Sequence, residues 1–403
     1  KDGVIYTTAH NATVAVDALT GKQIWRVAHE YPPETLRVVC CGIVNRGAAM
    51  YEGKIIRALM DNQMIALDAK TGKEVWRSAS PAPATAANGF AMTGAPLVVN
   101  GVVIAGVAGA EYGHRGFIEG YDAQTGKHLW RHYNVPAPGE KGAETWANDS
   151  NVTGGGSSWV TGSYDPELDL VFWGTGNPSP WNPRGRKGDN LYTNSVVALK
   201  PKTGERVWHF QTSPNDPFDY DAVQTPVVGH VKVEGKMRKV VMQPNRNGFL
   251  YVLDAANGKL LAADKFVPAN WASHVDLATG RPVMTGDADY SKGPKVVIPS
   301  FLGGVSGNLE AAPNGTSYLG HGWMGHLPDF SFIKFRYKPC WANPSANAAL
   351  SVRVNRPLAD TSCSRGTTCR ASRNSTRAGR PCCSGSSRCT SSACTSPWNF
   401  CRG

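Results

Sequence analysis

The segment VAVDALTGKQIW (14–25) recurs along the chain and determines the fold that we predict. Three later copies end in the same tryptophan, and a fifth copy ends in Ala262. These copies are IALDAKTGKEVW (65–76), EGYDAQTGKHLW (119–130), VALKPKTGERVW (197–208) and YVLDAANGKLLA (251–262). Each copy predicts a β-hairpin, because a strand is followed by a turn with a glycine, which supplies positive φ, and then by a second strand.

A single hairpin cannot bury its own tryptophan, so each one is expected to pack on a neighbouring copy. The tryptophans are Trp25, Trp76, Trp130 and Trp208, and their spacings of 51, 54 and 78 residues are blade-sized with one insertion. We therefore predict an all-β fold, a β-propeller with Trp-docking repeats and roughly five to six four-stranded blades. The competing interpretation is a β-sandwich, in which such hairpins and core tryptophans also occur.

The composition agrees with this fold and restricts the partners. The chain has 44 Gly, 27 Pro and only 18% charged residues, which favours short strands and tight turns. Residues 351–403 contain nine Arg and one acidic residue, so they supply +8 of the net charge of +11, and residues 1–350 carry +3. We expect no nucleic-acid partner, because residues 1–350 lack a basic face interleaved with aromatics. We also expect no membrane span and no signal peptide within this chain, since the required apolar segments are missing.

Two adjacent cysteines, Cys40 and Cys41, stand apart from the other eight, which all lie at or beyond Cys340. The Cα atoms of neighbouring residues are about 3.8 Å apart, whereas a disulfide prefers about 4.4–6.8 Å. A bridge between them would close a strained ring, and such strain is typical of functional sites. Two reduced thiols that fill a strand are the equally open alternative.

A second set of positions is rich in oxygen donors. Glu111 lies in AGAEYGHRG (108–116), Asn177 in WGTGNPSPW (173–181), and Asp219 and Asp221 in PNDPFDYDAV (214–223). Carboxylate and amide oxygens without His or Cys partners suit a hard cation such as calcium. Taken singly, each residue is as well explained by turn formation.

Together these segments resemble the methanol/ethanol family of PQQ-dependent (quinoprotein) alcohol dehydrogenases, with PQQ denoting pyrroloquinoline quinone. The resemblance covers about residues 1–304 and rests on segments in the family's order. These are the CCG pair with Arg46, MTGAP (92–96), AGAE (108–111), GGGSSW (154–159), GTGNP (174–178), NDPFDYD (215–221) and NRNGFLYVLD (245–254). It implies a propeller of the eight-bladed quinoprotein type, incomplete in this chain.

The resemblance also implies a cofactor site. A Cys40–Cys41 disulfide and Trp159 would enclose the planar quinone. The positions that would hold its carboxylates and carbonyls are Arg46, Thr93, Ala108, Gly109, Ala110 and Ser157. Arg246 would lie beside the reactive carbonyl.

For the metal, the resemblance implies Glu111, Asn177 and Asp219 as ligands, with calcium or a lanthanide ion as the occupant. Asp221 resembles the additional carboxylate of the lanthanide-dependent branch, and a solvated Asp at a strand end is the alternative. Asp219 would also act as the general base that removes the hydroxyl proton of the alcohol. Asp219 and Arg246 are thus the expected catalytic residues.

The function that follows is oxidation of primary alcohols to aldehydes. Because the chain contains no CxxCH motif, we expect a soluble cytochrome c as a separate electron acceptor. The cysteine pair and the cofactor favour the bacterial periplasm, and a homo-oligomer is left open. The alternatives are a non-catalytic periplasmic propeller scaffold and a polyol- or sugar-oxidising quinoprotein. The substrate cannot be deduced from the sequence.

The resemblance ends after PSFLGG (299–304), where the family's Lys-Asn-Trp segment is replaced by VSGNLEAAPNG. Residues 361–403 are rich in Ser, Arg and Cys and nearly devoid of Leu, Ile and Val. The alternatives for this segment are a disulfide-rich module, a metal-binding module and an out-of-frame or disordered tail. We favour the last, since no CxxC pairs occur and few apolar residues surround the cysteines. We therefore expect a partial propeller in residues 1–304 and no function in residues 305–403.

Overall fold

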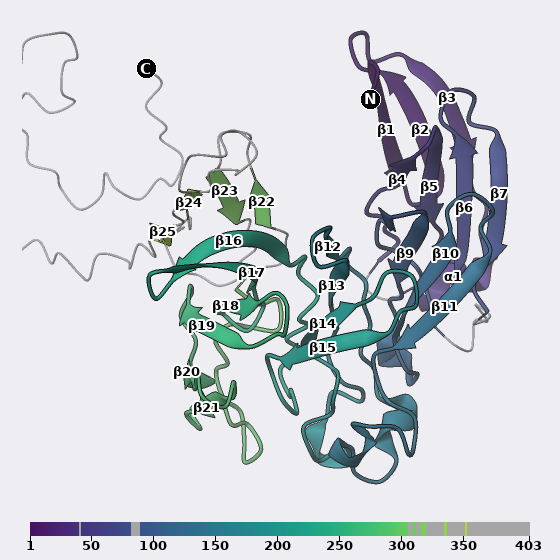
Figure 1. The fold of residues 1–403 in the computed structure, drawn as a ribbon. Helices are drawn as coiled ribbons and strands as arrows, with labels where there is room; N and C mark the ends of the chain where they lie inside the picture. The colour runs from purple at the N-terminus through teal and green to yellow at the C-terminus, as the bar shows by residue number, and fades with distance from the viewer. Residues whose placement is uncertain are drawn as a thin grey trace, which may run out of the picture. The chain divides into compact units, whose positions relative to one another are not determined.

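The computed structural model describes residues 1–39, 42–81 and 89–304, and beyond them four short strands between residues 309 and 352. All of these residues belong to one compact unit, residues 1–355. The fold of this unit is almost entirely β, and its strands follow one another in antiparallel sheets (Figure 1). Cys40, Cys41 and residues 353–403 lie outside the described residues.

Four complete sheets of four strands follow a first sheet of three, and in each the strands are neighbours in chain order. The first sheet contains β1 (Val4–Ala9), β2 (Ala12–Asp17) and β3 (Gln23–Ala28). The second contains β4 (Ala49–Tyr51), β5 (Lys54–Ala58), β6 (Gln63–Asp68) and β7 (Glu74–Ala79). The third contains β8 (Leu97–Val99), β9 (Val102–Gly106), β10 (Phe117–Asp122) and β11 (His128–Tyr133).

The fourth and fifth sheets have the same order. The fourth contains β12 (Ser163–Asp165), β13 (Leu170–Gly174), β14 (Ser195–Leu199) and β15 (Arg206–Gln211), and the fifth contains β16 (Val227–Val233), β17 (Lys236–Pro244), β18 (Phe249–Asp254) and β19 (Leu260–Lys265). The helical segments are short: α1 (Pro33–Val38), η1 (Ala110–Tyr112), η2 (Ala143–Thr145), η3 (Ser150–Thr153) and η4 (Pro183–Gly185). These sheets confirm the predicted all-β blades and exclude the single-sandwich alternative.

The repeated turn is built as the sequence predicts. Asp68 Oδ1 accepts hydrogen bonds from the backbone N–H of Thr71 at 2.8 Å and from its hydroxyl at 2.7 Å. The N–H of Gly72 then donates to the Asp68 carbonyl at 2.8 Å, with Gly72 at a φ of +72°. In the fourth copy Lys200 replaces this aspartate, so the side-chain acceptor is lost, and the N–H of Gly204 still donates to the Lys200 carbonyl at 2.9 Å.

Each tryptophan docks on the turn of the next sheet. The indole N–H of Trp25 donates to the carbonyl of Ala69 at 3.0 Å, and a Cβ on Gly72 would lie 2.9 Å from the Trp25 ring. The same bond joins Trp76 to Ala123, Trp130 to Pro201 and Trp208 to Ala255, at 3.0–3.1 Å. The turn glycine therefore has two functions, because it supplies positive φ and leaves space for the neighbour's indole.

The cores lie between neighbouring sheets, and the middle strands contribute to two of them. In β5, Ile55 packs toward the first sheet with Ala15, whereas Ile56 packs toward the third sheet with Val103. This alternation follows from the two-residue period of a strand. Central strands buried on both faces explain why their sequences are apolar throughout rather than alternating.

One feature differs from the sequence prediction. A further hairpin, β20 (Ala272–Val275) and β21 (Pro282–Met284), has a DLATG turn in which Asp276 Oδ1 accepts from Ala278 N–H at 2.8 Å. Its Gly280 faces the ring of Phe210 rather than a tryptophan, so the Trp pattern did not reveal it. Beyond residue 304, β22 (Leu309–Ala311), β23 (Thr316–Leu319), β24 (Lys334–Arg336) and β25 (Ser351–Val352) pair in chain order. Among the described residues, no helix has the length and apolar character needed to cross a bilayer.

The docking contact can be tested with two matched glycines. Gly126 (φ +75°) lies against the Trp76 ring, where a Cβ would approach to 2.6 Å, whereas Gly21 (φ +69°) has nothing within 4 Å. Gly21→Ala should cost only the backbone strain of about 1–2 kcal/mol. Gly126→Ala should cost a further 1–3 kcal/mol or so from the displaced indole. Urea unfolding measures both, and equal losses would contradict the docking role of Gly126.

Candidate active site

The candidate residues come from equivalent places in successive sheets. Glu111, Asn177 and Arg246 each follow the second strand of a sheet, namely β9, β13 and β17. Ala108, Gly109 and Ala110 also follow β9, and the other candidates lie in the linkers that connect one sheet to the next. Those described are Arg46, Thr93, Ser157, Trp159, Asp219 and Asp221. Repetition of one blade plan therefore brings residues far apart in sequence to the same end of the sheets.

The carboxylate of Asp221 joins three of these segments. Its Oδ1 accepts the backbone N–H of Asn177 at 2.8 Å. Its Oδ2 accepts the indole N–H of Trp159 at 3.0 Å and lies 3.4 Å from Arg246 Nη1. Asp221 is buried, so these charge-assisted contacts form away from bulk solvent. The alternative of a solvated Asp221 is therefore wrong, because the side chain is buried.

Arg46 and Trp159 form the other side of the site. Arg46 Nη1 donates to the hydroxyl of Thr93 at 2.7 Å, and its guanidinium lies 4.7 Å from the centroid of the Trp159 ring. Arg246 approaches the same ring to 5.8 Å. Burial lowers the pKa of Arg46. Two cationic side chains thus lie close to one indole.

Several buried polar atoms here have no hydrogen-bond partner among the described residues. They are Glu111 Oε2, Asn177 Oδ1, Ser157 Oγ and Arg246 Nε. Burial, and secondarily the charge of Asp221, raise the pKa of Glu111 to about 7, although Arg246 opposes the shift. Burial and Asp221 likewise raise the pKa of Asp219 far above its ordinary value. Unpaired oxygens and carboxyls that retain their protons are what a site built for a cation has in the absence of that cation.

The carboxylates do not form a tight cluster. Within residues 1–39, 42–81 and 89–304, no three His, Cys, Asp or Glu side chains lie together closely enough to hold an ion as they stand. A bound ion would therefore draw in the side chains of Glu111 and Asp219 and use the amide oxygen of Asn177. The donors present are all oxygens, so they fit calcium or a lanthanide ion.

The small residues before Glu111 shape its turn. Ala108 exchanges backbone hydrogen bonds with Ala91, and Gly109 has a φ of +92°. A Cβ on Gly109 would lie 1.9 Å from the Gly89 carbonyl oxygen, so only glycine fits. Ala110 then begins η1, which carries Glu111. Cys40 and Cys41, the expected partners of Trp159, lie outside the described residues.

Some residues of the site were not predicted from the sequence. Gln224 Nε2 donates to the Asp221 carbonyl at 3.1 Å, and Gln224 Oε1 lies 3.4 Å from the backbone N of Arg246. A Cβ on Gly303 would clash with the Arg246 side chain at 1.8 Å. Gly303 belongs to the PSFLGG segment, whereas nothing in the local sequence distinguishes Gln224.

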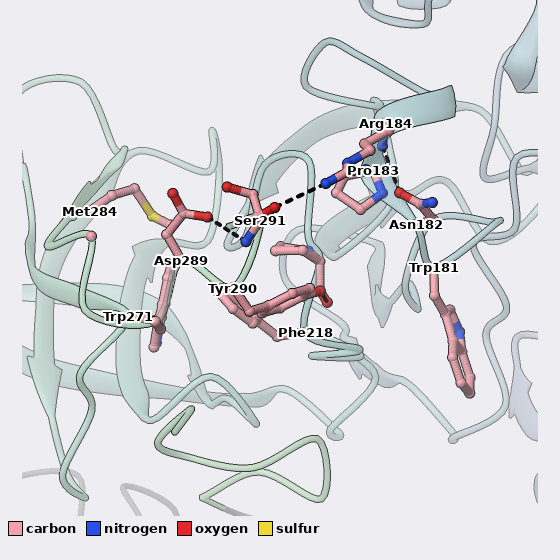
Figure 2. A pocket seen from close by; sticks show the side chains of 13 residues that line it. Trp181, Asn182, Pro183, Arg184, Phe218, Trp271, Met284, Asp289, Tyr290 and Ser291 are labelled. Atoms are coloured by element: carbon pink, nitrogen blue, oxygen red, sulfur yellow. Dashed lines mark hydrogen bonds between the residues drawn. The ribbon is translucent and has the colours of Figure 1, made fainter. Parts of the chain in front are cut away.

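A cavity of about 610 Å³ lies beside the loop that carries Asp219 (Figure 2). Its lining includes Trp181, Phe218, Trp271 and Tyr290, and Arg184 Nη2 donates to the Ser291 carbonyl at 3.0 Å at its edge. None of the candidate metal ligands or cofactor contacts lines this cavity. The aromatic cavity and the carboxylate site are therefore distinct, although Phe218 precedes Asp219 directly.

Comparison with known proteins agrees with this architecture. Residues 1–283 match the family described as glucose/ethanol/alcohol dehydrogenase, beta-propeller domain. The chain therefore belongs to the family of PQQ-dependent alcohol dehydrogenases, which confirms the resemblance noted in the sequence.

Individual relatives are similar over a large part of the chain. Quinohemoprotein alcohol dehydrogenase ADH IIB of Pseudomonas putida is 47% identical over 317 residues, which cover 75% of this chain and 46% of that protein. The solved structure of ADHIIG from Pseudomonas putida HK5 is 38% identical with a TM-score of 0.75, over 84% of this chain and 51% of that one. A europium-containing methanol dehydrogenase is 33% identical with a TM-score of 0.73, over 83% and 61%. The chain thus spans about half the length of the curated relatives it matches.

The raised pKa of Glu111 predicts a pH dependence of stability for the chain without a cation. A pKa near 7 in the folded state exceeds the ordinary value of 4.5, so the fold binds the proton more tightly than the unfolded chain does. The stabilisation of the fold that comes from protonated Glu111 is complete below about pH 4.5. This stabilisation is lost as the pH rises through 7. Each unit by which the folded-state pKa exceeds the unfolded-state pKa corresponds to about 1.4 kcal/mol of free energy of unfolding.

Thermal unfolding in chelator should therefore show that Glu111→Gln is less sensitive than the unchanged chain to a rise from pH 4.5 to 7. The expected difference is several degrees Celsius. Glu205→Gln, at an exposed carboxylate paired with Lys200, is the control and should leave the dependence unchanged. Parallel curves for the unchanged chain and Glu111→Gln would contradict the prediction.

Proposed function

We propose that the chain is the propeller part of an enzyme that oxidises primary alcohols to aldehydes. PQQ is the redox cofactor, and calcium or a lanthanide ion lies beside it. One observation carries the proposal: Glu111 Oε2 and Asn177 Oδ1 are buried without partners in the site that Asp221 and Arg246 hold together. Membership of the family supplies the reaction class.

The cofactor would be held by residues already close to one another. Trp159 offers its ring to one face of the planar quinone, and the Cys40–Cys41 pair is assigned to the other. The polar contacts would come from Arg46, Thr93 and Ser157 and from the segment Ala108, Gly109 and Ala110. Bound PQQ supplies the group that accepts a hydride from the alcohol carbon. Ser157 Oγ, buried without a partner, fits a role as donor to the cofactor.

Asp219 is the base in this proposal, and it takes the hydroxyl proton of the alcohol. A base must be ionised, whereas burial and the charge of Asp221 favour the proton on Asp219. Arg246 opposes this effect, with its Nη1 3.3 Å from the Asp219 carbonyl oxygen and 3.4 Å from Asp221 Oδ2. Additional positive charge beside Asp219 would complete its ionisation. The calcium or lanthanide ion would supply that charge, held beside the base by the proposed ligands Glu111, Asn177, Asp219 and Asp221.

The choice between calcium and a lanthanide depends on Asp221. Asp221 Oδ1 accepts one hydrogen bond and keeps a lone pair that can face an ion, whereas Oδ2 accepts from both Trp159 and Arg246. A further carboxylate benefits a trivalent ion more than a divalent one. The europium-containing relative supports the same choice, and we propose lanthanide use slightly ahead of calcium.

We further propose that the reduced cofactor passes electrons to a cytochrome c and that the enzyme acts in the bacterial periplasm. The haem in the name of the Pseudomonas putida relative supports a haem acceptor. Residues 1–304 form the functional unit in this proposal, because every described residue of the site lies within them. Residues 305–403 are assigned no role.

A non-catalytic propeller scaffold is the rival function, and it gives no reason for an unpaired carboxylate oxygen next to a buried Asp221. A sugar- or polyol-oxidising quinoprotein is the second rival. The deciding experiment reconstitutes the chain with PQQ and either calcium or lanthanum. Dye-linked oxidation is then measured with ethanol, glycerol and glucose. Oxidation of ethanol alone supports the proposal, and turnover of glucose in preference to ethanol would contradict it.

The role of Asp219 predicts that Asp219→Asn abolishes turnover while PQQ still binds. The amide keeps the volume of the side chain but cannot accept the proton. The loss should be at least about 100-fold, the lower end of what general-base catalysis contributes. PQQ binding is measured by the quenching of tryptophan fluorescence. Retained activity of Asp219→Asn would eliminate Asp219 as the base.

The role of Asp221 predicts that Asp221→Ala abolishes lanthanide-supported oxidation and spares calcium-supported oxidation. Because Asp221 also accepts from Trp159 and Asn177, Asp221→Asn serves as the control that keeps one acceptor oxygen. Equal losses with both ions would assign Asp221 to positioning alone.

A further inference from the structure

A buried acidic side chain outside the proposed ligand set holds the loop that presents Asp219. Asp216 is 2% exposed, and its Oδ1 accepts the backbone N–H of Phe218 at 2.8 Å. Its Oδ2 accepts the N–H of Tyr220 at 2.7 Å. The amides on both sides of Asp219 are therefore held by one carboxylate.

This double contact acts on a backbone in an unfavourable conformation. Asp219 has a φ of +63°, in the left-handed region that costs a side-chain-bearing residue about 1–2 kcal/mol. The amides of Phe218 and Tyr220, fixed on Asp216, leave Asp219 little choice of conformation. Asn194 Nδ2 donates to Asp216 Oδ2 at 2.7 Å and fixes the carboxylate in turn.

Arg186 ties the same loop to the segment that follows Asn177. Arg186 is fully buried, and its Nε donates to the Pro180 carbonyl at 2.6 Å. Its Nη2 donates to the carbonyls of Trp181 and Asp216. One rigid guanidinium thus joins the backbone three residues after Asn177 to the backbone three residues before Asp219.

We propose that Asp216 and Arg186 are positioning residues that set the separation between Asn177 and Asp219, so that these two residues can receive an ion without movement of the backbone. The inference rests on the proposed metal site. Neither Asp216 nor Arg186 contacts the ion in this scheme. Partners that orient ligands in this way typically change metal affinity by about 10–100-fold when they are removed.

The test measures terbium binding to the full 403-residue chain, with terbium luminescence sensitised by tryptophan as the readout. Asp216→Asn keeps the size of the side chain but turns an amide NH2 toward at least one donor among Phe218, Tyr220 and Asn194. We expect its dissociation constant for terbium to rise about 10–100-fold. Hydrogen exchange at the amides of Phe218 and Tyr220 should become faster in the same variant.

Asp165→Asn is the matched control. Asp165 is also buried, and its Oδ1 accepts the backbone N–H of Glu167 and Leu168 at 3.0 and 2.8 Å, in a turn that carries none of the candidate ligands. Its substitution should lower stability and leave terbium affinity unchanged. Should Asp216→Asn fail to fold, Arg186→Lys keeps the charge but not the three-way contact, and it should weaken binding in the same direction.

The outcomes separate this inference from the proposed function. Tight binding by the unchanged chain, loss of binding in Asp219→Asn and weakened binding in Asp216→Asn support both. Unchanged affinity in Asp216→Asn and Arg186→Lys overturns the positioning role alone. An equal loss in Asp165→Asn overturns it as well, because the effect would then reflect stability. Absence of terbium binding by the unchanged chain overturns the proposed metal site together with this inference.

Discussion

The rest of the structure depends on the bond between an indole N–H and a backbone carbonyl in the turn of the next hairpin. It recurs from Trp25, Trp76, Trp130 and Trp208, each time at 3.0–3.1 Å. The bond satisfies a donor that burial would otherwise leave unpaired, and the ring covers a glycine that no other residue could replace without a clash. Because the contact fixes each sheet on the next, it also fixes where each linker and each second-strand loop ends.

That regular spacing explains how a site can be assembled from short segments scattered over 200 residues. Glu111, Asn177 and Arg246 occupy equivalent loops, and the linkers supply Trp159 and Asp221 between them. Asp221 is the point at which these segments meet, since three of them donate to one buried carboxylate. The electrostatic cost of placing Glu111 and Asp219 nearby is met partly by Arg246 and leaves both carboxyls with raised pKa values.

The sequence predicts the local and repeated parts of this protein well. The hairpins follow from a pattern of turn glycines and tryptophans because they depend on residues close in the chain, and the Trp docks follow because one contact repeats between successive copies. The β20–β21 hairpin escaped the same reasoning, since Phe210 takes the place of the tryptophan over Gly280. The candidate site became recognisable only through an ordered resemblance. Contacts such as Trp159 to Asp221, 62 residues apart, and Arg186 to Asp216, 30 residues apart, depend on tertiary geometry that no local pattern contains.

The docking bond also has a direction, and this direction limits how the sheets can assemble. The second, third and fourth sheets each give an indole on one side and receive one on the other, which is a head-to-tail contact rather than a symmetric one. A series of such contacts either closes on itself or ends with one giving face and one receiving face. Gly21, with the geometry of the other turn glycines and nothing within 4 Å, marks the receiving face of the first sheet. The β2–β3 turn therefore has the backbone geometry that receives an indole in the later sheets, and the described residues place no side chain over its glycine.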